Sequence, residues 1–267
     1  MTTGALIFAF NNEQTDYVAM AVWSAANIRR HLGIPTAVIT DVPDDPRLRQ
    51  VDAVIPAKRA AGGTRYFEDY DSTVTWYNAG RVDAYSLTPW DQTLLLDADF
   101  VVASSDLTQV LAMSQDVVCH DIAYDLARAQ QLSGLNVFGR YNIPMSWATV
   151  MMFRKSAMAA YVFDCMHMIR ENWQHYRDLY GINNRTYRND YALSIALGIV
   201  NGHQPRTDFV PWALATVMPQ DALTMVDQDV FDVAYTDTRG KTFYHRFGNQ
   251  DFHAMGKSHL EKLIADA

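Results

Sequence analysis

The chain has 267 residues, of which 49% are hydrophobic and 12% aromatic, so it is long and apolar enough to form a globular core and is not a disordered chain. Its formal net charge of −8 argues against a protein that holds nucleic acid through a general basic surface. The sequence shows no apolar run of membrane-spanning length and no signal peptide, so we expect no membrane partner. Cys119 and Cys165 are its only cysteines and lie among apolar residues, which favours a reducing, cytoplasmic location.

The first part of the chain alternates strand-like and helical patterns. We expect strands at 5–10, 36–40 and 51–55, and a helix that is capped by Thr15 or Asp16 and ends at Gly33. This alternation predicts an α/β fold with a mostly parallel sheet flanked by helices. In such sheets, ligands bind at the carboxyl ends of the strands.

The rest of the chain carries a weaker pattern. A loop is expected at 60–72, helices at 74–87, 156–169, 190–199 and 259–265, and strands at 116–119, 146–153 and 242–247. Residues 120–144 look irregular, and residues 173–188 are rich in aromatic and basic side chains. Because there is no repeat and no clear linker, we expect one domain, 1–267, with an elaborated C-terminal half.

The most informative stretch joins Leu94-Leu95-Leu96 to Phe100-Val101-Val102 through Asp97-Ala98-Asp99. The apolar flanks predict a buried strand, and burying an unpaired carboxylate is costly. A divalent cation would compensate the two acids, and oxygen ligands suit Mg²⁺ or Mn²⁺. Such a metal also binds diphosphates, although two acids at a strand end can form an ordinary turn or helix cap instead.

Other polar and aromatic residues fall at or near the ends of predicted strands, so we expect them to share the site with Asp97 and Asp99. Phe10 and Tyr17 could stack on a base, and Asn11 could read its edge. Asp41 could bind the base or ribose. Tyr17 could equally belong to the core, and Asp41 could simply begin a turn.

The segment from Arg81 to Asp99 resembles the core of nucleotide-sugar glycosyltransferases with the GT-A fold, most closely the glycogenin-like, retaining family 8 type. The resemblance implies that Arg81 contacts the sugar nucleotide, as a lysine does in that family, and that Asp97-Ala98-Asp99 contacts donor and metal. It implies a third metal ligand, a histidine in a His-x-x-Gly…Lys pattern. His245-Arg246-Phe247-Gly248 matches its first part, with Lys257 further away than the family spacing.

Two departures concern the donor sugar. The family carries Asn-x-Gly before a central strand, where this chain has Trp147-Ala148-Thr149. The family also has an Asp-Gln pair, where Asp190 is here followed by Tyr191. The N-terminal stretch 8–12 looks similar to glycosyltransferase-type proteins of tailed phages, for which the location would be the host cytoplasm.

The resemblance implies a role for each remaining residue. Asp97, Asp99 and His245 are expected to hold Mn²⁺, or Mg²⁺, and Arg81 and Lys257 to neutralise phosphate oxygens. Asp190 is expected near the anomeric carbon, where a carboxylate can stabilise an oxocarbenium-like transition state or orient the acceptor. Alternatively, His245 is an ordinary strand histidine, Asp190 a helix N-cap and Lys257 a solvated helix cap.

The sequence therefore predicts a metal-dependent glycosyltransferase that moves a sugar from a nucleoside diphosphate, by resemblance UDP, to a hydroxyl acceptor. Residues 1–103 would bind the nucleotide, and residues 104–267 would bind the acceptor and complete the metal site. One alternative is a phage DNA glycosyltransferase acting on hydroxymethylated bases. Its aromatic and basic surface would comprise Arg177, Arg185, Arg188, Tyr176, Tyr180 and Tyr187. Another is a non-catalytic module that binds nucleotide sugars.

Overall fold

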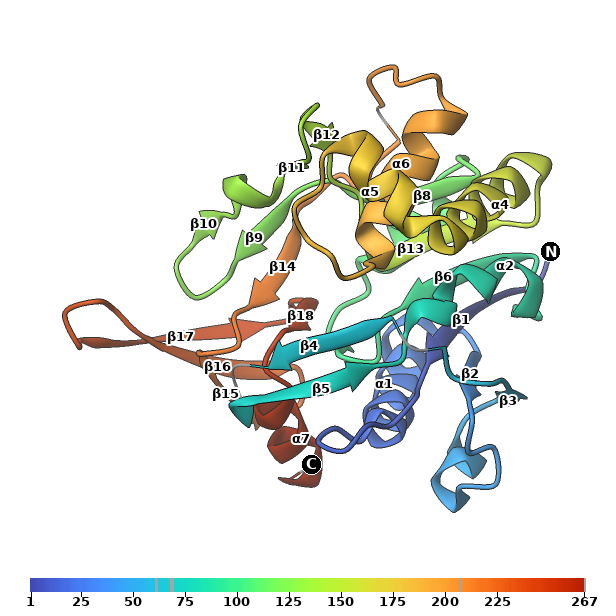
Figure 1. Ribbon diagram of the computed structural model, residues 1–267. Helices are drawn as coiled ribbons and strands as arrows, with labels where there is room; N and C mark the ends of the chain where they lie inside the picture. Colours follow the sequence, from blue (N-terminus) through green and yellow to red (C-terminus); the bar gives the residue numbers. More distant parts are fainter. Residues whose placement is uncertain (61, 68–69, 207, 267) are drawn as a thin grey trace.

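The computed structural model describes residues 1–60, 62–67, 70–206 and 208–266, and its centre is a six-stranded sheet (Figure 1). The strands, in spatial order, are β3 (Ala53–Pro56), β2 (Thr36–Thr40), β1 (Thr3–Phe8), β6 (Gln92–Leu96), β13 (Trp147–Arg154) and β8 (Val117–His120). All pairings from β3 to β6 are parallel, and β13 runs antiparallel to both of its neighbours. The expected α/β fold with a mostly parallel sheet is confirmed.

Helices cover both faces of this sheet because its central strands are apolar on both sides. On one face, Ala5 and Ile7 of β1 pack in a core with α1 (Tyr17–Leu32). On the other face, Leu6 and Phe8 pack with α4 (Ala157–Glu171) and α6 (Asn189–Val200). The predicted limits of α1 are confirmed, since Asp16 accepts a hydrogen bond from the Ala19 amide and Gly33 takes a left-handed conformation.

A second sheet contains β7, the strand that directly follows the two acids, and it also contains a strand from near residue 250. Its strands, in spatial order, are β10 (Gln130–Gln131), β9 (Ala123–Asp125), β14 (Leu214–Val217), β18 (Phe252–Ala254) and β7 (Phe100–Val101). His253 lies opposite Phe100 in the antiparallel pairing of β18 and β7, and the Ala254 amide donates to the Asp99 carbonyl at 3.0 Å. This pairing places a C-terminal strand beside the acidic turn.

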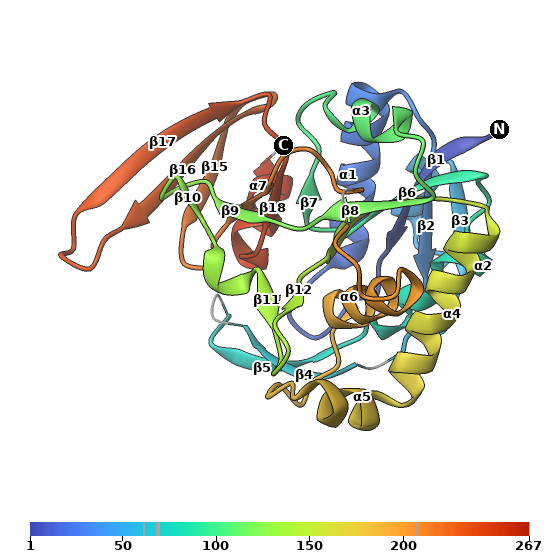
Figure 2. The same cartoon turned by 90° about the horizontal axis from the view of Figure 1, so that it is seen from above.

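Smaller elements surround the two sheets. Strands β15 (Ala222–Asp227), β16 (Val230–Thr236) and β17 (Thr242–Gly248) form a separate sheet that projects from the body (Figure 2). The short strands β11 (Val137–Phe138) and β12 (Ile143–Pro144) pair, and the remaining helices are α2 (Ala84–Leu87), α3 (Leu107–Ala112), α5 (Trp173–Tyr180) and α7 (Lys257–Asp266). Among the described residues, no helix has both the length and the apolar character needed to span a bilayer.

Two sequence-based expectations between the first strands and β6 are wrong. The stretch 60–72, expected to be a loop, contains β4 (Gly63–Phe67), which pairs with β5 (Ser72–Trp76); residues 61, 68 and 69 lie outside the described part. The helix expected at 74–87 is instead the end of β5, a 3-10 helix and α2. The alternation Thr73-Val74-Thr75 has a period of two, which favours a strand. The apolar residues over the whole of 74–87 suggested a helix instead and obscured this short strand pattern.

The stretch 120–144, expected to be irregular, contains the short strands β9 to β12. These strands are two or three residues long, too short to leave a periodic pattern in the sequence. The helices expected at 156–169, 190–199 and 259–265 are confirmed as α4, α6 and α7, with limits that differ by a few residues.

The end of β8 contains a buried histidine that makes stability depend on pH. His120 is 1% exposed, and its Nδ1 has no hydrogen-bond partner among the described residues. Burial lowers the pKa of His120 to about 3 from its usual 6.5. As the pH falls below about 6.5, His120 therefore binds a proton in the unfolded chain but stays neutral in the folded protein. This difference lowers the free energy of unfolding by about 1.4 kcal/mol per pH unit.

We therefore expect His120→Leu to flatten the loss of thermal stability between about pH 6.5 and pH 4, whatever its effect at neutral pH. The measurement is the melting temperature of the wild type and the variant across this range. His175→Leu, at an exposed position on α5, is the control and should reproduce the slope of the wild type. Parallel curves for His120→Leu and the wild type would contradict the assignment.

Candidate active site

A cavity of about 550 Å³ opens where the acidic turn after β6 meets β1, β13, β14, β18 and the β4–β5 hairpin. The charged side chains that line it are Arg81, Asp97, Asp99, Arg188, Asp190 and Lys257. Among the described residues, three carboxylates therefore face three cations, and the cavity is formally neutral without a bound ion. Its position agrees with the rule that ligands bind at the carboxyl ends of parallel strands.

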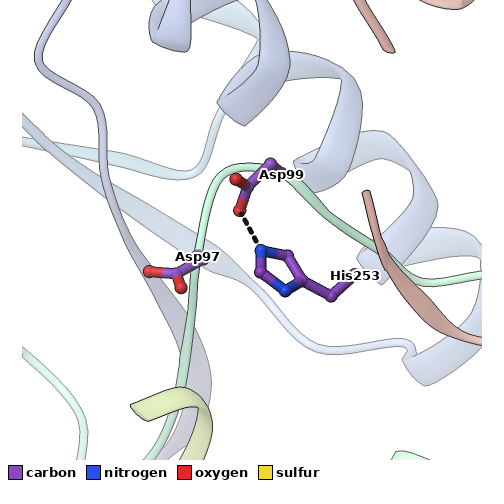
Figure 3. A group of neighbouring side chains, drawn as sticks. All are labelled: Asp97, Asp99 and His253. Atoms are coloured by element: carbon purple, nitrogen blue, oxygen red, sulfur yellow. Dashed lines mark ion pairs between the residues drawn. The ribbon is translucent and has the colours of Figure 1, made fainter. Parts of the chain in front are cut away.

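Two of these carboxylates form a group with a histidine that suits a metal ion. One ligand atom each from Asp97, Asp99 and His253 lies within 4.8 Å of the other two. Figure 3 shows the His253 ring beside Asp99, and the Nε2 to Oδ1 distance is 3.5 Å. Two carboxylate oxygens and an imidazole nitrogen are a donor set that fits Mn²⁺ or Mg²⁺.

Asp99 is also paired with Lys257, the first residue of α7. Both side chains are buried, and the Lys257 ammonium group also donates to the Ala254 carbonyl at 3.3 Å. Burial on its own would raise the pKa of the Asp99 carboxyl, but Lys257 and His253 outweigh burial and hold this pKa far below its usual range. Asp99 is consequently an anion at any physiological pH, as a metal ligand must be.

Asp97 is paired with Arg81, whose side chain is 2% exposed. The Arg81 guanidinium also donates to the Ala148 carbonyl at 2.5 Å. Burial lowers the pKa of Arg81 to about 10, and the charges of Asp190 and Asp99 oppose this shift, so the group stays protonated at neutral pH. Arg81 and Lys257 thus already compensate the negative charges of Asp97 and Asp99. Contrary to the expectation from the sequence, the two acids do not need a metal ion for this purpose.

The third carboxylate, Asp190, lies in the first turn of α6 and is held from two sides. One oxygen accepts a hydrogen bond from the Ala148 amide at 2.9 Å, and the other accepts from Arg188 at 2.7 Å. The N-cap position of α6 is occupied by Arg188. Asp190 is therefore a fixed carboxylate in the cavity wall, and the helix-cap alternative does not describe it.

The structure brings most of the expected site residues together. Phe10, Tyr17 and Ala98 line the cavity with the charged groups named above. Asn11 is not among the lining residues; its side chain accepts from the Val18 amide at 3.0 Å and donates to Asp16 at 3.1 Å, which fixes the start of α1.

Asp41 is likewise absent from the cavity lining, and its carboxylate forms an ion pair with Arg59 at 2.9 Å. Both Asn11 and Asp41 follow strands of the parallel sheet, so their place in the sequence correctly indicated the edge of the sheet where the cavity lies. Their side chains nevertheless have partners in neighbouring loops. A strand end predicts the edge of the sheet, but it leaves open which direction a side chain takes.

The histidine expected at position 245 requires a correction. His245 lies on β17 in the projecting sheet, where its exposed ring stacks with Tyr235 and Phe247 at centroid distances of 5.9 and 6.3 Å. The histidine beside the acids is His253. The sequence did carry a signal for it, because His253-Ala254-Met255-Gly256 has the same His-x-x-Gly spacing and Lys257 follows immediately.

Several further lining residues were not expected. Thr64 and Tyr66 come from β4, Asn78 from the turn after β5, and Trp147 from the first position of β13. The first three were missed because the hairpin and the residues directly after it were taken for a loop and a helix. Trp147 was noticed only as a departure from the family pattern, and the structure makes it part of the cavity wall.

Three of the six residues expected to build an aromatic and basic surface for DNA binding do not present their side chains for it. Tyr180 and Tyr187 are 9% and 6% exposed, respectively, so their rings are unavailable for stacking on bases. Arg188 faces the cavity and pairs with Asp190.

No protein-family model matches the sequence, and no curated protein is significantly similar to it. Among solved structures, the galactosyltransferase LgtC in complex with donor and acceptor sugar analogs is 14% identical, covers 73% of this chain and 70% of its own, and has a TM-score of 0.44. Mouse xyloside xylosyltransferase 1 is 11% identical, covers 79% of this chain and 84% of its own, and has a TM-score of 0.45.

The glycosyltransferase GlyE of Streptococcus pneumoniae is 11% identical with a TM-score of 0.43; the match covers 79% of this chain but spans only 46% of GlyE. None of these TM-scores reaches 0.5. The fold class therefore rests on the strand order of the protein itself.

The two histidines allow a matched test of the metal site. We expect His253→Gln to weaken the binding of Mn²⁺, in the presence of UDP, by at least about tenfold, because it removes the only nitrogen donor of the group. His245→Gln, on the projecting sheet, should leave the affinity unchanged. Free Mn²⁺ can be counted by electron paramagnetic resonance, and equal losses in both variants would rule out the assignment of His253.

Proposed function

We propose that the protein is a metal-dependent glycosyltransferase of the GT-A type that transfers a sugar from a nucleoside diphosphate, UDP by family resemblance, to a hydroxyl acceptor. One observation carries this proposal: a charge-balanced cavity that contains an Asp–Asp–His group. A divalent cation would give the cavity two positive charges in excess. A diphosphate is the ligand that would balance them.

The proposal assigns Asp97, Asp99 and His253 to the metal, which as a Lewis acid would stabilise the negative charge of the leaving diphosphate. Lys257 contributes a further positive charge from the start of α7, directly behind Asp99. Arg81 is a positioning residue in this proposal, because its buried guanidinium holds Asp97 in place and ties it to the Ala148 carbonyl. These fixed charges need little reorganisation when the diphosphate departs.

At the nucleotide end, Phe10 and Tyr17 provide aromatic surface near the end of β1. At the sugar end, Asp190 is held by the Ala148 amide and by Arg188. A carboxylate fixed in this way can stabilise the positive charge that develops on the anomeric carbon, or orient the acceptor hydroxyl. The same peptide segment thus supports both ends, since Ala148 donates to Asp190 and accepts from Arg81.

The two departures from the family pattern bear on the sugar. Tyr191, where the family has glutamine, packs against Phe138 and Trp173 at centroid distances of 4.6 and 6.1 Å and is not among the cavity-lining residues. Trp147, where the family has asparagine, adds an indole to the wall. A donor sugar would therefore meet fewer polar groups here than in the family, so its identity and the stereochemical course should be measured directly.

A non-catalytic module that binds nucleotide sugars is the competing proposal. The retained and doubly anchored Asp190 favours catalysis, because binding a diphosphate does not require a carboxylate at the sugar end. A thermal-shift screen of nucleoside diphosphate sugars with Mn²⁺ would identify the donor, because a bound ligand raises stability by mass action. Donor hydrolysis and transfer would then be measured with the sugar that binds.

We expect Asp190→Asn to lower the turnover number for donor hydrolysis by about 100-fold, because the amide keeps the shape but loses the charge. The affinity for UDP with Mn²⁺ should change little, since Asp190 is assigned to the sugar end. Asp178→Asn, on the exposed side of α5, is the control and should behave as the wild type. Undiminished hydrolysis in Asp190→Asn, or in the wild type with all metal chelated, would refute the mechanism.

A further inference from the structure

We propose, on the basis of the proposed function, that the acceptor presents its hydroxyl next to an uncharged, apolar group, and that residues 129–139 bind this group at the mouth of the cavity. Three features of this segment support the proposal: its uncharged composition, its exposed apolar side chains and its hydrogen-bonded backbone.

The segment 129–139 reads Ala-Gln-Gln-Leu-Ser-Gly-Leu-Asn-Val-Phe-Gly and contains no charged residue, although 19% of the chain is charged. It follows β9, includes β10 and the 3-10 helix Ser133–Leu135, and ends just after β11. Leu132 and Leu135 line the cavity. The segment therefore forms an uncharged wall of a cavity whose other lining residues include six charged groups.

The wall exposes apolar surface that the protein itself does not cover. Leu135 is 42% exposed and Val137 is 44% exposed, so the apolar surface continues from the cavity to the outside. Tyr66, on β4, also lines the cavity and is 58% exposed. Exposed apolar side chains that line a polar site are typical of a ligand-binding groove.

The backbone of this wall is fixed by hydrogen bonds on both sides. The Leu132 amide donates to the Ala123 carbonyl at 2.9 Å, and the Leu135 amide donates to the Leu132 carbonyl at 2.9 Å. Further along, the Met145 amide donates to the Asn136 carbonyl at 2.8 Å. The bonds to Ala123 and Met145 tie the segment to its neighbours, and the bond between Leu135 and Leu132 closes a turn within it, while Leu135 and Val137 stay exposed to solvent.

The apolar wall fits the acceptor better than the donor. The diphosphate and the metal match the charged residues, and the proposed base-binding surface is provided by Phe10 and Tyr17 near β1. The lining residues of the wall lie between β10 and β11 (Figure 2), and β10 pairs with β9, whose neighbour is β14; Ala123 of β9 and Thr216 of β14 also line the cavity. Here an alkyl chain or an aromatic ring attached to the acceptor would cover Leu132 and Leu135 and release water.

The test compares acceptor analogues that differ only in their apolar group. Methyl, octyl and phenyl glucosides, each below its micelle concentration, are titrated calorimetrically into the protein with and without UDP and Mn²⁺. We expect octyl or phenyl glucoside to bind at least about tenfold more tightly than methyl glucoside. Preference for octyl would identify an alkyl group, and preference for phenyl would identify an aryl group.

Two matched variants locate the effect. Leu135→Asn should remove most of the preference, whereas Leu179→Asn should retain it, because Leu179 is 50% exposed on α5 and does not line the cavity. Equal binding of all three glucosides, an unchanged preference in Leu135→Asn, or equal losses in both variants would overturn the inference.

The inference and the proposed function can fail separately. If UDP with Mn²⁺ does not bind, the glycosyltransferase proposal and its acceptor fail, and a preference for octyl glucoside without nucleotide would then show only an apolar binding site. If the nucleotide binds and the donor is hydrolysed but the three glucosides bind alike, the enzyme proposal stands and the apolar acceptor is refuted.

Discussion

The candidate site depends on the pairing of β7 with β18. The two acids lie in the turn between β6 and β7, and this short antiparallel pairing brings His253 and Lys257 beside them. A carboxylate as deeply buried as Asp99 would be costly to ionise without these partners, because burial alone disfavours its charge. The sheet therefore positions the candidate metal ligands and also makes an ionised Asp99 tolerable inside the protein.

The balance of charges gives this arrangement a second property. Buried ion pairs contribute little net stability, because the loss of hydration offsets the attraction between the charges. The main effect of the ion pairs Arg81–Asp97 and Lys257–Asp99 is therefore to orient the two carboxylates. They keep each carboxylate in one place, and a cation that binds between the acids and a diphosphate that follows it would leave the total charge of the cavity close to zero.

The sequence was most informative where burial leaves a long, regular pattern. The strands around β1 and β6, the helices α1, α4 and α6 and the acidic turn follow from apolar runs and caps. Arg81 and Asp190 also reached the cavity as expected. The β4–β5 hairpin was not predicted from the sequence, because its strands are short and rich in threonine. The composition of the first strand resembled a loop, and the second strand was included in a segment whose composition resembled a helix. Choosing between His245 and His253 required knowing which C-terminal strand pairs with β7, and that is a long-range contact that local patterns do not encode.

The β7–β18 pairing also has a consequence for synthesis of the protein. The acids emerge from the ribosome well before β18 and α7, which lie much later in the chain. Until they emerge, Asp99 has neither its lysine nor its histidine, and the acidic turn is left without its covering strand. A nascent chain would therefore carry an incomplete cavity, and the full set of charged groups that line it would assemble only once α7 has docked.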